Sequence, residues 1–600
     1  VAYKDERWSW PALPDTVPRF ISALQSVSVN DVQPQQQYSI FPSASVTHDR
    51  IDGKTNYRAG ADFFWRPSTN LQLTATINPD FGVAESDDVV INLSATETFF
   101  PEKRLFFLEG QDVFTASPRA DTRGAGVGNR GAPYTLVNTR RIGGKPVLPG
   151  LGAGESARTK DQIQPNDLLG AVKVTGQSGR IRYGVLAAFE DDPEFLVESE
   201  QGTRRVVGAG SEYGVARVLF EDEPGGAYKS FGLLSTMVLN EAGDALVQSL
   251  DAHYLGENGK FKADAQVFTS DKDGVDRGFG GFVDFEYAFR QGVTQRLGIE
   301  YFDDAVDVSD LGFLQRNDNF RIRQAHTRTR SDLNWARSNQ LDIRGFVQKN
   351  SEDLFTQGGL FVSNQSVLNN LSQVVLRLDL LAASYDDLNS FGNGAYRVKA
   401  RQMASIGWAS NRSKPLSLGG KLGFQGEELG GNSAVYSLYA TWRPDDRLVL
   451  DIMFNYLDRA GWLLHSRDRT MSTFDAEQWA PGIGLEYFIS AKQQLKFVVQ
   501  WVGVKARARD AYRILETPGD LQRRADLDAG VPDFAVSQVS LQGRYRWEIA
   551  PLSDLFVVYT RQSNQSGLLL QRDFETVFSD SYQQPVTDAF VVKLRYRFGS

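Results

Sequence analysis

Apolar and polar residues alternate along most of this chain. In the last segment, one face of an extended strand would carry only apolar residues, namely Phe590, Val592, Leu594, Tyr596 and Phe598. The other face would carry the cations Lys593, Arg595 and Arg597. A period of two with charges on one side fits a strand between lipid and a wet lumen. The same alternation recurs in segments such as 261–268, 283–290 and 495–501, and it predicts an all-β protein.

The connections between these segments fall into two classes. Very short turns, such as 178–179 and 257–259, contrast with long polar stretches, of which 507–533 is the best example. Short turns at one end and long loops at the other are typical of outer-membrane barrels. The pattern predicts a large transmembrane antiparallel β-barrel of about 24–28 strands, since bacterial barrels have even strand numbers.

A barrel of this kind implies a place and partners. We expect the outer membrane of a Gram-negative bacterium, with contacts to membrane lipid and lipopolysaccharide. The terminal aromatic Phe598, at the end of the apolar face, resembles the C-terminal signal by which the barrel-assembly machinery recognises its clients. A surface-exposed or periplasmic protein partner is a further expectation.

Composition removes several other classes of protein. The chain has 600 residues with a mean hydropathy of -0.34, and it has no uninterrupted apolar run of the length that a transmembrane helix needs. It has no cysteine, which excludes disulfides, cysteine-based zinc sites and thiol nucleophiles. The net charge of -9 and the pI near 5.3 argue against a nucleic-acid partner, because phosphate binding needs a basic surface. No cofactor is indicated.

One region, residues 78–165, breaks the alternation. It combines acidic residues with a cluster of aromatic and basic residues, and Pro101 stands where a sheet would need an N–H. Strand-like segments at 38–48, 57–65 and 71–77 precede it, so it is expected as a plug-like insertion and loop without strands, within a barrel formed by residues 37–600. Residues 1–36 are expected to be an extension or linker from an upstream domain that was removed with the export signal.

The charged residues of this region are the candidate site. Hard oxygen ligands of the kind that calcium prefers lie close together at Asp80, Glu85, Asp87 and Asp88. Further plug or lumen candidates are Glu97, Phe100, Glu102, Lys103, Arg104, Glu109, Arg140 and Arg141. Salt bridges inside the lumen are favoured over a structural calcium site, because the spacing is not that of an EF-hand loop. The glycine-rich stretch 124–154 is interpreted as a flexible loop, because no strand-to-helix context supports a phosphate loop.

These motifs resemble those of a known family, the DUF5916 proteins. The family hallmark is NPDFGxxExD, then ETFFPEKRxFFLEG, then an element like SRRIGRxP. This chain has Asn78 to Gly82 with Glu85 and Asp87, then Glu97 to Gly110, then Thr139 to Pro146. Thr139, Gly144 and Leu105 are small departures, and Asp310 to Leu314 also looks like a family element.

The resemblance implies more than the residues show. Many family members carry an N-terminal carbohydrate-binding family 9-like domain, and Trp8 to Pro11 would suit the end of a linker from one. Any glycan binding or carbohydrate uptake is implied here only by analogy.

No catalytic constellation is found in the sequence, and the protein is not expected to be an enzyme. His326 with Asp318 or Asp332, and His465 with Asp468, are the obvious histidine–aspartate neighbours, but no nucleophile accompanies them at a useful spacing.

Three functions stay open. The first is a plugged or gated conduit for a solute or polymer, and the second is a closed barrel that serves as a scaffold or translocon for a partner protein at the cell surface. A TonB-dependent importer ranks lower, because its plug precedes the barrel whereas here strands come first.

Overall fold

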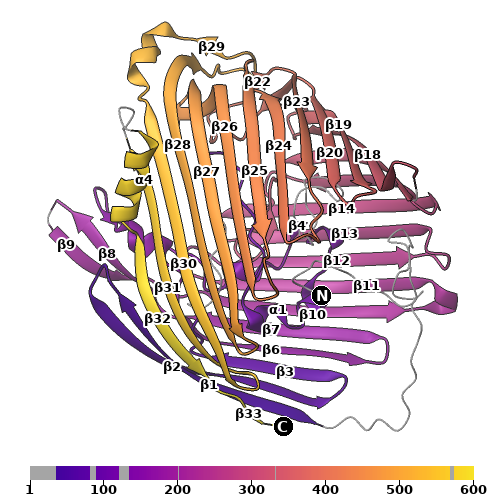
Figure 1. Ribbon diagram of the computed structural model, residues 1–600, viewed down its shortest axis with the longest axis vertical. Helices are drawn as coiled ribbons and strands as arrows, with labels where there is room; N and C mark the ends of the chain where they lie inside the picture. The colour runs from indigo at the N-terminus through magenta and orange to yellow at the C-terminus, as the bar shows by residue number, and fades with distance from the viewer. Residues whose placement is uncertain are drawn as a thin grey trace.

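The wall of the molecule is one antiparallel sheet that closes on itself (Figure 1). The computed structural model describes residues 36–81, 89–120, 134–200, 202–331, 333–567 and 573–599. The main sheet has 26 strands, of which the two-residue β29 and β33 only extend its margins, and the other 24 form the barrel. Closure is by pairing of β32 with β1, where Val592 lies opposite Val46. The predicted transmembrane antiparallel β-barrel is confirmed, at the lower end of the expected strand number.

The wall strands follow one another in chain order around the barrel. They are β1 (Gln37–Asp49), β2 (Lys54–Ser68), β3 (Leu71–Ile77), β6 (Leu168–Ser178), β7 (Ile181–Glu190), β10 (Glu212–Asp222), β11 (Tyr228–Leu239), β12 (Ala245–Leu255), β13 (Phe261–Lys272), β14 (Val275–Arg290), β15 (Val293–Phe302), β17 (Asn319–Ser331), β18 (Ala336–Lys349), β19 (Phe355–Leu368), β20 (Gln373–Leu381), β23 (Arg401–Ala409), β24 (Leu416–Gly426), β25 (Asn432–Trp442), β26 (Leu448–Arg467), β27 (Thr470–Ser490), β28 (Gln493–Arg513), β30 (Phe534–Ala550), β31 (Ser553–Gly567) and β32 (Thr587–Arg595).

Alternate residues of each strand point outward and inward. On β11, Phe231 and Leu233 are 62% and 52% exposed on the outer face, whereas the inward Leu234 is 1% exposed. The last strand shows the same division, because Phe590 and Leu594 are exposed while Lys593 is buried. A continuous exposed apolar face on every side of a closed sheet is what a lipid bilayer covers. No helix among the described residues is long and apolar enough to cross a membrane.

The two ends of the barrel differ in their connections. At the end that holds Gln37 and Gly599, turns of two to six residues join the strands, including 69–70, 291–292 and 410–415. Gly292 takes a positive φ of 72°, which the tight β14–β15 turn requires. All long connections lie at the other end: 78–167, 191–211, 303–318, 382–400, 514–533 and 568–586. The long loop predicted at 507–533 is shorter than expected, because β28 pairs with β27 as far as Arg513.

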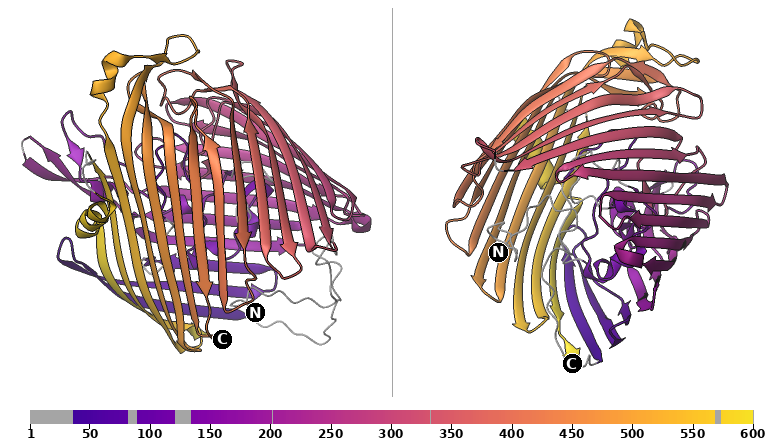
Figure 2. Two further views of the ribbon diagram at one scale, coloured as in Figure 1. Left: turned by 45° about the horizontal axis from the view of Figure 1, so that its top comes forward. Right: turned by 90° about the vertical axis from the view of Figure 1, so that its right-hand side faces the viewer.

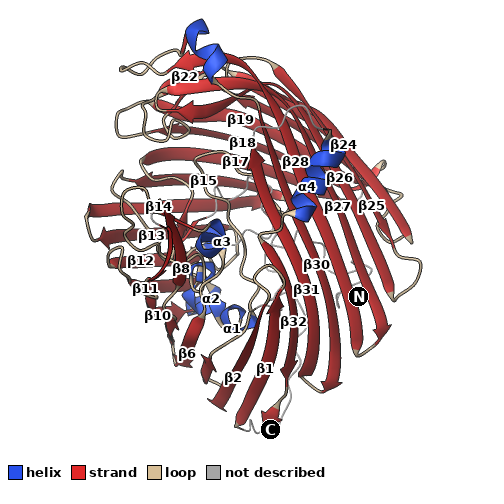
Figure 3. Ribbon diagram, turned by 90° about the vertical axis from the view of Figure 1, so that its left-hand side faces the viewer, coloured by secondary structure: helices blue, strands red, loops and turns tan. Residues whose placement is uncertain are grey.

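The insertion, residues 78–167, separates strands β3 and β6 in the chain, and strands β1 to β3 precede it. Much of its described part lies inside the closed sheet (Figures 2 and 3). Its elements are α1 (Leu105–Leu108), α2 (Gln111–Phe114), η3 (Pro118–Ala120), β4 (Tyr134–Thr135), η4 (Thr139–Arg141), β5 (Ser156–Ala157) and α3 (Thr159–Ile163). The prediction of a segment without strands is wrong in detail, because β4 pairs with the loop strand β16 (Phe313–Leu314) and β5 pairs with β8.

The remaining elements lie in the long loops and turns. They are β8 (Glu194–Ser199), β9 (Gly202–Val207), η5 (Pro224–Gly226), β21 (Ser384–Asp386), β22 (Tyr396–Val398), β29 (Gln522–Arg523), η6 (Ala525–Gly530), α4 (Phe574–Gln583) and β33 (Phe598–Gly599). The expected N-terminal extension falls almost entirely on residues 1–35, outside the described residues.

The largest apolar core lies inside the barrel, between the insertion and the wall. Phe107, Phe114 and Tyr134 of the insertion join inward residues of the wall such as Leu186 and Phe282 in one buried cluster. The expectation of a polar lumen is therefore wrong over this part of the wall, because the insertion covers apolar inner faces. Strands here read as apolar on both faces, as Leu233 and Leu234 illustrate.

Candidate functional site: the insertion and the lumen cavity beside it

The insertion is held together by a buried ion pair between Glu102 and Arg104. Their side chains are 2% and 6% exposed, and Arg104 Nη2 lies 2.7 Å from Glu102 Oε2. The same guanidinium donates to the carbonyls of Thr139 at 2.5 Å and Ile142 at 2.6 Å. Glu102 also accepts the hydroxyl hydrogen of Thr139 at 2.7 Å. The ETFFPEKR segment thus binds the TRRIG segment through side chains that are almost fully buried.

A second pair ties the same two segments at the surface of the insertion. Arg141 donates to both oxygens of Glu97, at 2.8 and 2.7 Å, and its Nε donates to the carbonyl of Gly312. Phe99 packs edge-on against Phe313 with ring centroids 4.9 Å apart. The sequence blocks at 97–110, 139–146 and 310–314, which lie far apart along the chain, therefore meet at one place.

The first block, around Asp80, joins them. The Arg104 guanidinium lies 5.0 Å from the ring centroid of Phe81 and 4.3 Å from that of Phe107. Lys593 of β32 donates to the backbone carbonyl of Asp80, which fastens this block to the closing strand of the barrel. The candidate calcium ligands Glu85, Asp87 and Asp88 lie outside the described residues, so calcium stays a prediction. The described residues contain no cluster of three potential metal ligands.

Most of the remaining candidate residues of the insertion take part in hydrogen bonds through their backbone. Phe100 is half-buried, and the amide of Lys103 donates to Glu102 Oε1 at 2.9 Å. The amide of Arg140 donates to Asn138 at the start of η4. The backbone carbonyl of Glu109 accepts a hydrogen bond from Lys173 of β6.

Two residues that the sequence did not single out anchor the insertion to the wall strands β13 to β15. Arg119 of η3 is buried and donates to both oxygens of Asp284 on β14, at 2.8 and 2.7 Å, and to Glu300 on β15 at 2.5 Å. Tyr134 of β4 lies among three inward phenylalanines, with centroid distances of 5.9, 5.8 and 5.6 Å to Phe268, Phe282 and Phe302.

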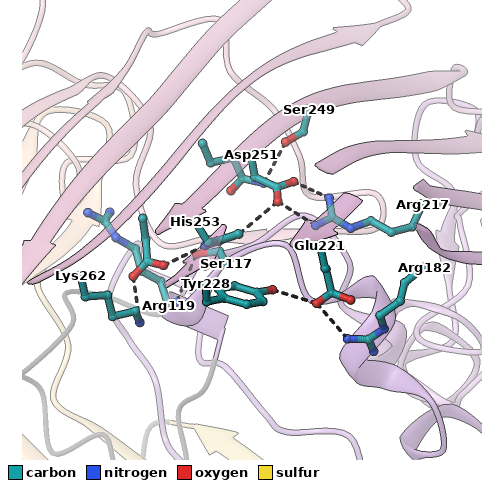
Figure 4. Close-up of polar contacts among 12 residues, drawn as sticks. Ser117, Arg119, Arg182, Arg217, Glu221, Tyr228, Ser249, Asp251, His253 and Lys262 are labelled. Atoms are coloured by element: carbon teal, nitrogen blue, oxygen red, sulfur yellow. Dashed lines mark hydrogen bonds and ion pairs between the residues drawn. The ribbon is translucent and has the colours of Figure 1, made fainter. Parts of the chain in front are cut away.

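A charged network on the inner wall was also missed. His253 on β12 lies between Asp264, 2.8 Å from Nδ1, and Asp251, 3.1 Å from Nε2 (Figure 4). Asp251 is paired in turn with Arg217 of β10, at 2.7 Å from Nη2. Asp251 and His253 are two apart on a strand and so face the same way, which is the signal that could have found them.

A cavity of about 640 Å³ remains in the lumen beside Arg119. Its wall is formed by inward side chains of β13 to β20 and β23, and residues 384–389 of the loop after β20 border it. The aromatic residues Phe346 and Phe361 also line it, and their rings stack with centroids 5.5 Å apart and an interplanar angle of 8°. Its basic residues are Arg119, Lys262, Arg296, Arg316, Arg321, Arg323, Arg344 and Arg401.

The Glu102–Arg104 pair predicts a pH dependence. Burial raises the pKa of Glu102, but the hydrogen bonds and charge of Arg104 outweigh it, and the net pKa lies below the usual value for glutamate. A carboxyl group whose pKa is lower in the folded than in the unfolded protein, where it is about 4.3, stabilises the folded state at pH values above about 4.3. This stabilisation is lost as the pH falls through the folded-state pKa. We expect hydrogen–deuterium exchange in residues 97–110, corrected for intrinsic rates, to accelerate between pH 5 and 3. Glu102→Gln should flatten this dependence and Glu97→Gln, at a half-exposed site, should not.

The barrel-assembly candidates lie on the outer face of the closing seam. Phe590, Val592, Leu594, Tyr596 and Phe598 are exposed or half-exposed, and Phe598 pairs with Ile40 of β1. The inward Arg595 pairs with Asp62 at 3.1 Å. Recognition by the assembly machinery stays a prediction.

Fold and site together define a large transmembrane β-barrel whose lumen holds a packed insertion. The chain belongs to the family described as Domain of unknown function (DUF5916), whose model matches residues 34–598.

Among solved structures, the chain is similar to a mutant of the ferric enterobactin receptor PfeA from Pseudomonas aeruginosa. The identity is 9%, 94% of this chain and 80% of that chain are covered, and the TM-score is 0.41. The siderophore receptor PirA from Acinetobacter baumannii is 8% identical, with 95% of this chain and 81% of that chain covered and a TM-score of 0.40. The copper transporter OprC is 10% identical, with 95% of this chain and 81% of that chain covered and a TM-score of 0.36. No curated protein matches the chain.

Proposed function

We propose that this protein is an outer-membrane conduit for a solute, and that the insertion holds it closed at rest. The observation that carries the proposal is the charged cavity of about 640 Å³ that lies in the lumen beside the insertion. A barrel whose only task is anchoring has no need of an inner space lined with charged side chains, whereas a conduit needs sites that a solute can enter and leave.

The direction of the barrel follows from its connections. Short turns face the periplasm and long loops face the exterior in outer-membrane barrels. The insertion leaves the wall after β3 and returns at β6, both at the long-loop end, so it would enter the lumen from outside the cell. A plug tethered at both ends and packed against apolar wall residues opens by local rearrangement, because it cannot leave the barrel as a unit.

Conductance in planar bilayers tests the proposal. Strands β3 and β6 pair directly, with Ile77 opposite Gly170, so residues 79–166 can be replaced by a short Gly-Ser turn without separating the wall. We expect the intact protein to be nearly silent and this variant to show large, steady channels. The matched control replaces residues 192–209, which carry the β8–β9 hairpin between the paired strands β7 and β10. That control should stay silent.

Two results would contradict the proposal. One is a silent barrel after removal of residues 79–166, with folding established by heat-modifiable migration. The other is a large conductance in the intact protein, because the insertion would then not close the lumen.

A scaffold for a partner protein is the second candidate. Strands β26, β27 and β28 have 20, 21 and 21 residues, about twice the 9–11 that a membrane crossing needs. One side of the barrel therefore rises well beyond the membrane on the long-loop side. Co-purification of one stable protein from native membranes, lost on shortening these strands, would favour the scaffold. Carbohydrate uptake remains a prediction by family analogy.

A further inference from the structure

Four guanidinium groups gather at one side of the lumen cavity. Arg321 and Arg323 are alternate inward residues of β17, Arg316 comes from the loop that precedes this strand, and Arg119 comes from the insertion. Arg119, Arg316 and Arg323 all lie close enough to Arg321 to repel it. The wall, the loop before β17 and the insertion thus bring like charges together, and none of these four side chains is more than 16% exposed.

The carboxylates in contact with this cluster are fewer than the cations. The ion pairs join Arg119 to Asp284 and Glu300, Arg321 to Glu300, Arg323 to Asp284, and Arg316 to Asp387. Four cations therefore share three carboxylates, and the cluster keeps an excess of positive charge. An anion that entered the cavity would be drawn to it, because the surroundings screen charge less than water does.

Several N–H groups of the cavity also lack acceptors. Arg316 Nε, Arg323 Nη1 and Arg296 Nη1 are buried and have no hydrogen-bond partner among the described residues. Buried donors without acceptors are rare in folded proteins, and each one costs free energy. Planar guanidinium groups pair best with carboxylate and phosphate oxygens, which accept two parallel hydrogen bonds.

Aromatic rings also line the cavity, beside the cationic cluster. The stacked rings of Phe346 and Phe361 line it, and the Arg321 guanidinium lies 5.4 Å from the Phe346 centroid. A volume of about 640 Å³ lies within the range of small-molecule sites, roughly 300–1,000 Å³. The cavity thus offers a cationic end and an apolar surface to one small molecule.

We propose that the cavity binds a small organic anion with a carboxylate or phosphate group, which Arg316 and Arg323 hold while its body packs on Phe346 and Phe361. This inference rests on the proposed conduit and names the class of solute that it would pass. The site lies between wall and insertion, so a bound anion would contact both.

Isothermal titration of the intact protein in detergent at low salt tests the site. Citrate probes the carboxylate, glucose 6-phosphate probes the phosphate, and glucose is the neutral comparison. We expect at least one of the two anions to bind, glucose not to bind, and the affinity to fall as KCl is added. Arg323→Gln should weaken anion binding about tenfold or more, the loss expected for a charge-assisted hydrogen bond.

Arg323 is the position of choice because Asp284 keeps both hydrogen bonds from Arg119 when Arg323 is replaced. Arg204→Gln, in the exposed β9 strand, is the matched control and should leave binding unchanged. Equal binding of glucose and glucose 6-phosphate, or unchanged affinity in Arg323→Gln, would overturn the inference. So would the absence of binding by either anion.

The two proposals fail in different ways. Anion binding to a barrel that stays silent after removal of residues 79–166 would support the site and refute the conduit. Channels in that variant, without anion binding to the intact protein, would support the conduit and refute the site.

Discussion

Replacing Arg104 with alanine is expected to destabilise the insertion by about 3–5 kcal/mol, because it leaves a buried charge without its partner. Glu102 would keep Thr139 as a hydrogen-bond donor but lose the guanidinium, and two carbonyls of the TRRIG segment would lose theirs. Local opening exposes Lys103, Arg140 and Arg141 to trypsin. The rate of cleavage within residues 97–145, under conditions where reclosing is fast, should rise about a hundredfold or more.

The control for this prediction lies in the same two segments. Arg141→Ala breaks the pair with Glu97, whose side chain is 49% exposed, and exposed pairs contribute about 0–1 kcal/mol. Its cleavage rate should rise less than tenfold. Equal rates for the two variants would show that the buried pair does not hold the segments together.

Tyr134→Ala is expected to cost about 3–5 kcal/mol, since truncation of a fully buried aromatic residue leaves a cavity. Tyr134 is packed against Phe268, Phe282 and Phe302, so the substitution would detach β4 from the wall. The measurement is the free energy of urea-induced unfolding in lipid vesicles, together with trypsin cleavage near residue 141.

Tyr134→Phe is the matched control. The hydroxyl of Tyr134 is buried with no hydrogen-bond partner among the described residues, so its removal should leave stability unchanged or raise it by about 1 kcal/mol. A loss of stability in Tyr134→Phe comparable to that of Tyr134→Ala would mean that the hydroxyl, and not the ring packing, fixes β4.

Several features were predictable because their signal is local. Alternation of apolar and polar residues at a period of two marks the lipid face of strands such as β32, whose inward residues are charged. In strands that the insertion covers, such as β11, both faces are apolar. The interruption after Ile77 and the motifs around Glu102 marked the insertion. Glu97, Glu102, Arg104 and Arg141 were recognised as charged candidates, although the sequence did not say which acid each arginine would bind.

Other features had no local signal. Arg119 binds Asp284 and Glu300, which are 165 and 181 residues away, and nothing near Arg119 in the sequence indicates this. The apolar core inside the lumen was missed for the same reason, because an inward Leu234 is explained only once a covering segment is known to lie over it. Asp251 and His253 did carry a signal, their spacing of two on one strand, which went unused.

Local patterns in the chain were enough to predict the class of the wall, the lipid-facing residues of strands such as β32, and the point where the insertion leaves the wall. Those properties depend on neighbours two residues apart and on backbone hydrogen bonding. Three further properties became visible only in the folded barrel: the inner faces that the insertion covers, the carboxylates that its arginines bind, and the position of the cationic cavity. These depend on the path of the insertion across the closed barrel, because burial and ion pairing are set by which distant strands closure brings into contact.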